Sequence, residues 1–111
     1  MAIQPSSFVL RLAPKGNPMT APYIVTVDIG TSSAKTVLWS LEGVALAQAS
    51  EAYPLQRPHP VWAEIDAELW WRATCNTVRH VIAESGVDPA AIIGVGVDAV
   101  GWTLVPVDAA G

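Results

Sequence analysis

Phosphate chemistry is suggested by the stretch VDIGTSSAK, residues 27–35, in which a carboxylate, a glycine, three hydroxyl side chains and a lysine follow one another. Apolar runs precede and follow it, so the polar residues lie where a strand ends. At such a place a glycine lets backbone amides and hydroxyls approach a phosphate, and the carboxylate of Asp28 can hold a magnesium ion directly or through water. Lys35 would add a positive charge.

Two other interpretations of this stretch compete with a phosphate site. A P-loop is rejected, because GTSSAKT lacks the second glycine of GxxxxGK[ST] and the residues after it are typical of a strand rather than a helix. A plain hairpin turn is the simpler alternative, since Asp, Gly and Ser are the ordinary residues of turns. Spacing alone does not favour either the phosphate site or the turn.

Composition indicates one small folded domain. The chain has 111 residues, of which 51% are hydrophobic, and this is enough to build a core. Six Lys and Arg against ten Asp and Glu give a formal charge of -4, which argues against nucleic acid as a partner.

The distribution of apolar residues and cysteine points to the cytoplasm. No run approaches the roughly 18 apolar residues of a membrane helix, and Arg11 interrupts the apolar run near the amino terminus, so neither a membrane span nor a signal peptide is expected. The single cysteine, Cys75, cannot form an internal disulfide and is interpreted as a buried thiol in a reducing compartment.

The amino-terminal part of the chain predicts a tail and a meander of strands. Residues 1–22 contain four prolines and no periodicity, so a disordered tail is expected there, with the fold starting at Tyr23. Residues 23–27 and 36–39 are short apolar runs joined by a connection too short for a helix, which predicts two antiparallel strands. A glycine-containing turn leads into a third strand over residues 44–52, followed by a proline-rich loop.

The helix predicted after that loop has clear boundaries. Asp66 is a candidate N-cap, with Ile65 and Trp70 at the positions of a hydrophobic staple. Apolar residues then recur at helical spacing until Gly86, which can end the helix in the left-handed conformation. The tryptophans in and before this helix are expected to anchor the core: Trp62, Trp70 and Trp71.

Two further strands are expected beyond the helix. Residues 92–97 form a continuous apolar run, typical of a strand buried on both faces, and residues 103–107 predict one more strand. The resulting β-β-β-α-β order predicts an α/β fold with a mixed sheet, in which the strand after the helix is parallel to its neighbour.

Three segments in order resemble the N-terminal domain of the FGGY family of carbohydrate kinases. VDIGTSSAKTVLW resembles the first phosphate motif of the actin-like, ribonuclease H-like ATPase superfamily. RPHPVWAEIDAELWW, residues 57–71, resembles the xylulokinase segment before the first long helix, and GVGVDAVGWTLVPVD, residues 94–108, is similar to the sugar-contacting strand and loop, with ribulokinase-like features. The resemblance covers residues 23–111 and implies an incomplete ribonuclease H-like domain.

The resemblance also implies roles for individual residues. Asp28 matches the magnesium-associated aspartate of the family, and Lys35 matches the basic residue that ends the phosphate loop. The loop on the ATP phosphates corresponds to four residues: Gly30, Thr31, Ser32 and Ser33. The sugar-contacting positions correspond to five: Asp98, Ala99, Val100, Gly101 and Trp102.

The sugar-contacting positions depart from the xylulokinase pattern. That pattern resembles Gln-Met-His-Gly, where this chain has Asp-Ala-Val-Gly at residues 98–101. Asp98 could accept hydrogen bonds from sugar hydroxyls or could cap the next turn, and the two interpretations are equally supported. Trp102 could stack on a sugar, but packing within the domain is the favoured interpretation.

The implied activity is ATP- and Mg²⁺-dependent phosphorylation of a sugar, a pentulose such as xylulose or ribulose, or a related polyol. The resemblance places the catalytic base beyond Gly111, so the chain by itself is expected to contain no catalytic residue and to be inactive. The alternative is a non-catalytic module of the same fold that binds sugar, nucleotide or a partner. Apolar surface left uncovered on such a chain would favour self-association.

Overall fold

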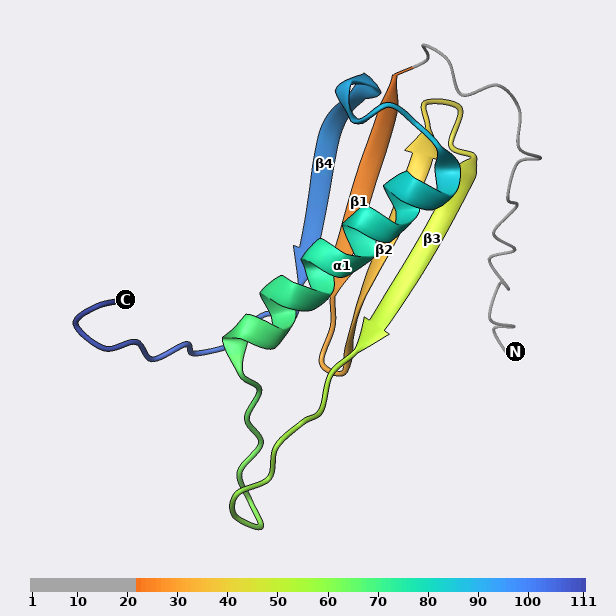
Figure 1. Ribbon diagram of the computed structural model, residues 1–111. Coiled ribbons are helices and arrows are strands. Elements are labelled where there is room, and N and C mark those ends of the chain that lie inside the picture. Colours follow the sequence, from red (N-terminus) through yellow and green to blue (C-terminus); the bar gives the residue numbers. More distant parts are fainter. Residues whose placement is uncertain (1–21) are drawn as a thin grey trace, which may run out of the picture.

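The computed structural model describes residues 22–111 and contains four strands, one long helix and one short 3₁₀ helix (Figure 1). In chain order these are β1 (Tyr23–Ile29), β2 (Ser33–Ser40), β3 (Ala45–Ala52), α1 (Ala67–Ser85), η1 (Pro89–Ala91) and β4 (Ile92–Ala99). The tail predicted for residues 1–22 lies outside the described residues except for Pro22, which is exposed.

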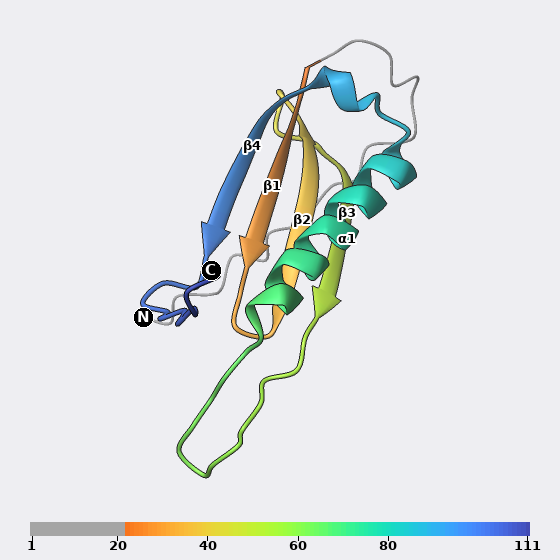
Figure 2. The ribbon, with the colours of Figure 1, turned by 60° about the vertical axis from the view of Figure 1, so that its left-hand side comes forward.

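The strands form a single mixed sheet in the order β3-β2-β1-β4. β1 is antiparallel to β2, β2 is antiparallel to β3, and β1 is parallel to β4. Figures 1 and 2 show α1 crossing one face of the sheet, over β2 and β3, while β4 lies beyond the helix at the edge. The predicted β-β-β-α-β order and the parallel returning strand are therefore confirmed.

Both ends of α1 are capped as predicted. The carboxylate of Asp66 accepts a hydrogen bond from the Glu68 N–H at 3.0 Å, which satisfies one of the free amides of the first turn. Gly86 adopts φ 69°, and its N–H donates to the Ile82 carbonyl at 3.1 Å. Within residues 22–111 no helix combines the length and the hydrophobicity needed to cross a membrane.

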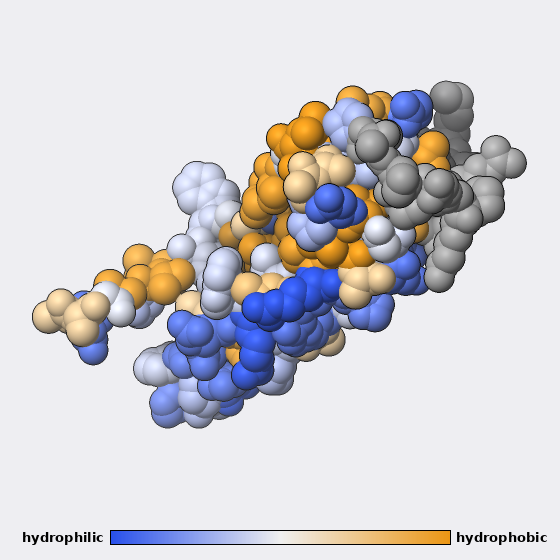
Figure 3. All heavy atoms as spheres, turned by 45° about the horizontal axis from the view of Figure 1, so that its top comes forward, coloured by the Kyte–Doolittle hydropathy of each residue, from blue (hydrophilic) through white to orange (hydrophobic). Residues whose placement is uncertain are grey.

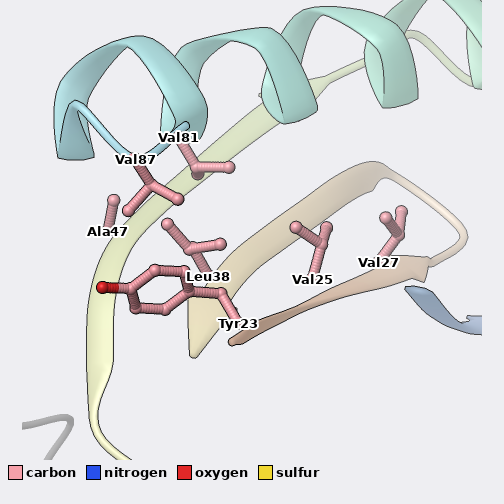
Figure 4. Packing of buried hydrophobic residues seen from close by; sticks show 7 residues of the cluster. All are labelled: Tyr23, Val25, Val27, Leu38, Ala47, Val81 and Val87. Carbon is pink, nitrogen blue, oxygen red and sulfur yellow. The ribbon is translucent and has the colours of Figure 1, made fainter. Parts of the chain in front are cut away.

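The main core lies between α1 and the middle of the sheet (Figure 4). Alternate residues of β1 point toward the helix, where Leu38 of β2 and Val81 of α1 meet them. The cluster comprises Tyr23, Val25, Val27, Leu38, Ala47, Val81 and Val87. Beside it the hydroxyls of Thr36 and Thr77 form a buried hydrogen bond of 2.7 Å, which joins β2 to α1 without leaving a polar group unpaired.

A second, smaller cluster lies under the end of the β1–β2 hairpin. Its buried members are Ala34, Tyr53 and Ala73. Ile65, Leu69 and Trp70 pack against it, so the two residues predicted to form a hydrophobic staple at the start of α1 lie on one cluster. This cluster therefore joins the beginning of the helix to the loop between the first two strands.

The region from β4 onward differs from the prediction. Residues 92–97 form a strand, but Val95 and Val97 are 66% and 64% exposed, so burial on both faces is wrong for this chain, because α1 lies over the other strands. The strand predicted for residues 103–107 is also wrong. The chain turns at Trp102, whose φ of 60° is left-handed, and leaves the sheet as an exposed segment that carries apolar side chains into solvent (Figure 3).

The predicted tryptophan anchors are confirmed in part. Trp70 is half-buried against the second cluster, but Trp62 and Trp71 are 51% and 66% exposed. The buried stripe of α1 consists of Ala73, Thr77 and Val81, and Trp71 lies off that stripe. Cys75 is half-buried rather than fully buried.

Candidate functional site

Three charged residues lie in one row across the sheet. Asp28 on β1 is paired with Lys35 on β2 and with Asp98 on β4. Cross-strand partners point to the same face of a sheet, and the neighbours of Asp28 that face α1 are buried whereas Asp28 is exposed. The row therefore lies on the face away from α1, where all three side chains are exposed to solvent.

An open hollow of about 420 Å³ lies along this row. The lining residues come from the ends of β1, β2 and β4: Thr26, Val27, Asp28, Lys35, Val37, Gly96, Val97 and Asp98. Gly96 has no side chain to fill the hollow, and a Cβ there would be 3.8 Å from Thr26 Cγ2. Its size is within the range of small-molecule sites, and its charged groups stand at one end of three strands.

The loop of residues 30–33 closes the hairpin beside this row, and its carbonyl groups are held by hydrogen bonds. The Gly30 N–H donates to the Ser33 carbonyl at 2.9 Å. The Gly30 carbonyl accepts a hydrogen bond from the Tyr53 hydroxyl, and the Ser32 carbonyl accepts one from the Tyr53 N–H at 3.0 Å. Tyr53 thus holds this 30–33 loop at two points.

The amides at the tip of the 30–33 loop, unlike three of its carbonyls, have no hydrogen-bond partner within residues 22–111. Thr31 and Ser32 are exposed, and their N–H groups donate no hydrogen bond to any of residues 22–111. The carbonyl just before the loop, that of Ile29, is engaged by the Val100 N–H at 2.8 Å. With the carbonyls of Gly30, Ser32 and Ser33 engaged and the amides of Thr31 and Ser32 unpaired among the described residues, the loop tip is suited to bind an anion.

The pKa of Tyr53 is raised in the folded chain. Burial of the ring raises the pKa of the Tyr53 phenol, and the negative charge of Asp28 raises the same pKa further. The hydroxyl therefore remains a hydrogen-bond donor to Gly30 throughout the neutral range.

A magnesium ion fits this donor set only if water and substrate phosphates complete its coordination. Residues 22–111 contain no group of three or more His, Cys, Asp or Glu side chains that could enclose a metal. Mg²⁺ is commonly held by one or two carboxylates together with water and substrate phosphates, and the exposed Asp28 beside unpaired loop amides provides such a place. The histidines lie elsewhere: His80 is 3.6 Å from Glu84, and His59 packs edge-on against Trp62.

The segment of residues 98–102 is built differently. Asp98 accepts a hydrogen bond from the Ala99 N–H at 2.9 Å, so one carboxylate oxygen is used in local capping and the group remains exposed. Trp102 is fully exposed, so the favoured interpretation that it packs within the domain is wrong for the described residues. A Cβ on Gly101 would meet no atom within 4 Å.

Comparison with known proteins identifies the family. The model of the FGGY family of carbohydrate kinases, N-terminal domain, matches residues 23–111. The chain belongs to the FGGY family of carbohydrate kinases. The predicted resemblance is thereby confirmed for the whole of the described fold.

Curated relatives of this FGGY chain include glycerol and xylulose kinases. Glycerol kinase 1 of Lactiplantibacillus plantarum is 34% identical over 79 residues, which are 71% of this chain and 16% of the relative. Xylulose kinase of Escherichia coli is 31% identical over 80 residues, 72% of this chain and 16% of the relative. The chain spans about one sixth of the length of the relatives it matches.

Solved FGGY structures give the same picture. Gluconate kinase from Lactobacillus acidophilus superposes with a TM-score of 0.65 and 28% identity, covering 72% of this chain and 16% of that one. A ligand-bound xylulose kinase from Lactobacillus acidophilus superposes with a TM-score of 0.64 and 28% identity, covering 70% and 15%. The predicted actin-like, ribonuclease H-like fold is confirmed.

Tyr53 was not among the predicted site residues of this FGGY chain, because it was expected to lie in the loop after the third strand. Tyr53 follows β3 directly, is 6% exposed and contacts the 30–33 loop through both its side chain and its backbone. The available signal was an aromatic residue with a polar tip at the end of a strand, just before a proline. Only the pairing of β2 with β3 shows that this end lies beside the loop.

Proposed function

We propose that this chain provides the phosphate-binding corner of an ATP-dependent carbohydrate kinase. The observation that supports the proposal most is the polarity of the 30–33 loop. Its carbonyls at Gly30, Ser32 and Ser33 accept hydrogen bonds from the protein, whereas the amides of the exposed Thr31 and Ser32 donate to no group among residues 22–111. A polyphosphate would accept hydrogen bonds from these amides and from the loop hydroxyls.

ATP and Mg²⁺ are the proposed cofactors. The carboxylate of Asp28 would hold the ion, either directly or through water, and Lys35 would place a positive charge beside the phosphates. When bound, the ion would neutralise charge that develops on the transferred phosphoryl group. Gly30, Thr31, Ser32 and Ser33 would fix the orientation of the phosphate chain.

A sugar or polyol is the proposed acceptor, bound near the 98–102 segment. Asp98 lies next to Asp28 in the row, so a hydroxyl bound by the free oxygen of Asp98 would lie close to the proposed phosphate position. Named relatives act on xylulose, glycerol and gluconate, and we propose a pentulose, such as xylulose or ribulose, or a related polyol for this chain. Ala99, Val100, Gly101 and Trp102 would complete that contact.

Catalysis would need parts outside residues 23–111, which we propose to be the N-terminal part of the first kinase domain. The resemblance places the base beyond Gly111, and the relatives are about six times longer than the matched segment. We expect no phosphorylation of xylulose, ribulose or glycerol by the 111-residue chain with ATP, and activity above an enzyme-free blank would overturn this expectation. Because the proposed reaction consumes ATP, we propose that the kinase works in the cytoplasm.

The phosphate role can be tested on the chain itself with inorganic tripolyphosphate. In a nitrogen-15 NMR titration with Mg²⁺ present, the amide signals of Thr31 and Ser32 are expected to shift with saturation. Asp28→Asn should remove the Mg²⁺ dependence of that affinity, whereas Asp88→Asn, which keeps the capping side chain of η1 at the opposite end of the sheet (Figure 1), should not change it. Saturable shifts located elsewhere, or none at all, would overturn the proposal.

A non-catalytic interaction module is the second candidate, and the exposed face of β4 favours it. Val95 and Val97 project from the helix-side face of the sheet without cover, and the following segment exposes Leu104 and Val107. Exposed apolar surface of this kind promotes association. Titration with tripolyphosphate separates the candidates, because a pure interaction module would show no saturable shift at the 30–33 loop.

A further inference from the structure

Tyr53 occupies a distinctive place between the core and the proposed phosphate loop. Its ring is buried with Ala34 of β2 and Ala73 of α1 in the second cluster. The start of α1 packs on the same cluster through Leu69 and Trp70, so the ring is held from the side of the helix. The polar end of the side chain is thereby aimed at the 30–33 loop, whose Gly30 carbonyl it reaches.

The hydrogen bonds at this point replace one that a closed hairpin turn would form. In a closed turn the Ser33 N–H would donate back to the Gly30 carbonyl. Among residues 22–111 that bond is not formed, and only the opposite one, from the Gly30 N–H to the Ser33 carbonyl, is present. The Tyr53 hydroxyl occupies the Gly30 carbonyl instead.

The backbone of Tyr53 holds a second carbonyl of the same loop. Its N–H donates to the Ser32 carbonyl at 3.0 Å. Fixing both carbonyls toward the protein fixes the Gly30–Thr31 and Ser32–Ser33 peptide planes, because each peptide group is planar and its N–H points opposite to its C=O. The amides of Thr31 and Ser33 are consequently turned away from Tyr53, and the Thr31 N–H, which donates to no group among residues 22–111, is free to bind an anion.

We propose that Tyr53 is the positioning residue of the 30–33 loop, which holds the Gly30 and Ser32 carbonyls inward so that the loop amides face a bound polyphosphate. This inference rests on the proposed phosphate role of the loop. Phenylalanine at this position would keep the ring in its cluster and the backbone bond to Ser32, but would leave the Gly30 carbonyl free to turn toward the anion, which it would repel.

Hydrogen exchange on the 111-residue chain tests the tether without any ligand. In Tyr53→Phe, the Gly30 amide, which donates a hydrogen bond to the Ser33 carbonyl, is expected to exchange about tenfold faster than in the unaltered chain, because the loop opens more often. Tyr23→Phe is the matched control: Tyr23 is equally buried, at 6% exposure, and its hydroxyl forms no hydrogen bond within the described residues. Unchanged loop exchange in Tyr53→Phe would overturn the proposal.

Binding of Mg²⁺-tripolyphosphate then tests positioning. Tyr53→Phe should weaken the affinity about fivefold to tenfold, with little change in melting temperature relative to Tyr23→Phe. If Tyr53→Phe loses affinity and its melting temperature also falls well below that of Tyr23→Phe, the loss of affinity reflects a structural role and the proposal is overturned. If the unaltered chain binds no tripolyphosphate, the phosphate function fails, while the exchange experiment still decides whether Tyr53 holds the loop.

A third measurement, NMR of the Tyr53 hydroxyl proton, uses only the unaltered chain. In the unaltered chain the Tyr53 hydroxyl proton is expected to exchange slowly enough with water to be observed by NMR, with a nuclear Overhauser effect to Gly30 or Ser33. A rapidly exchanging hydroxyl would contradict the tether. Agreement of this signature with the loop exchange rates would support Tyr53 as a positioning residue even if Tyr53→Phe proved unstable.

Discussion

The 30–33 loop and the 98–102 segment lie at the same end of the sheet, yet they are supported very differently. The 30–33 loop rests on a buried cluster and has its carbonyls engaged by Tyr53 and Gly30. The 98–102 segment is joined to the sheet by the Val100 N–H, carries local hydrogen bonds at Asp98 and Thr103, and is otherwise exposed. The phosphate side of the proposed site is therefore already formed in this chain, whereas the sugar side lacks support.

The strands beneath the two regions offer the largest test of this comparison. Leu38→Ala removes a fully buried side chain from β2 and is expected to lower the free energy of unfolding by about 2–5 kcal/mol. Val97→Ala, in the exposed β4, should change it by less than about 0.5 kcal/mol. Urea unfolding of the 111-residue chain measures both, and equal losses would mean that β4 is covered in solution.

Self-association would provide such a cover. We expect reversible association of the chain through the helix-side face of β4, measurable by sedimentation velocity. Val95→Lys combined with Val97→Lys should weaken it at least tenfold, because two charges would be buried at the contact. Val61→Lys, at a position that is 89% exposed in the loop before α1, is the matched control and should leave association unchanged. A monomer at every concentration would show that β4 remains bare.

The two glycines of the compared regions predict a smaller difference. A Cβ at Gly30 would be 3.3 Å from the Ser33 carbonyl oxygen, so Gly30→Ala must displace the loop and should cost about 1 kcal/mol of stability. Gly101→Ala meets open space and should stay within about 0.5 kcal/mol of the unaltered chain. Comparable losses at both positions, measured by thermal unfolding, would contradict the difference in support.

The smallest expected effect is on the ionisation of Tyr53. Its pKa lies above 10.0 in the folded chain because of burial and the charge of Asp28, so the folded state holds this proton more tightly than the unfolded state. The resulting stability is fully present below about pH 10 and is lost as the pH rises through the folded-state pKa.

Replacement of Asp28 isolates the electrostatic part of this effect. In a Tyr23→Phe background, where only Tyr53 titrates among the described tyrosines, Asp28→Asn should lower the Tyr53 pKa without returning it to 10.0, since burial remains. Ultraviolet absorbance of the phenolate follows the titration. A pKa that does not change would place the carboxylate too far from the ring to act on the loop.

Much of the fold was predictable from local patterns. The strands of the hairpin, the third strand and the capped helix follow from apolar periodicity and from Asp66 and Gly86, which act within a few residues. The parallel direction of β4 follows from the crossover through α1. These features depend on the chain's own backbone geometry, and each was confirmed.

Burial beyond the helix was not predictable in the same way. The run from Ile92 to Val97 has the composition of a strand that is buried on both faces. Such a composition allows burial but does not say which element would cover the strand. In this chain α1 lies over β2 and β3 instead (Figure 2). The predictions that Trp71 and Trp102 are packed were wrong for a related reason, because an aromatic side chain is buried only where another element covers it. The role of Tyr53 depends on tertiary proximity and has no local signature.

The irregular pairing between β1 and β4 has a consequence for how this site tolerates change. Tyr23 pairs with Ile92, but Ile24 pairs with Gly94, so Ile93 is an extra residue that shifts every later pair by one. If Ile93 were instead paired with Ile24, the odd and even positions of the strand would be exchanged, with Val97 beside Asp28 and Asp98 on the opposite face. The alignment of the two carboxylates thus depends on the backbone at an exposed residue that lies outside the site itself.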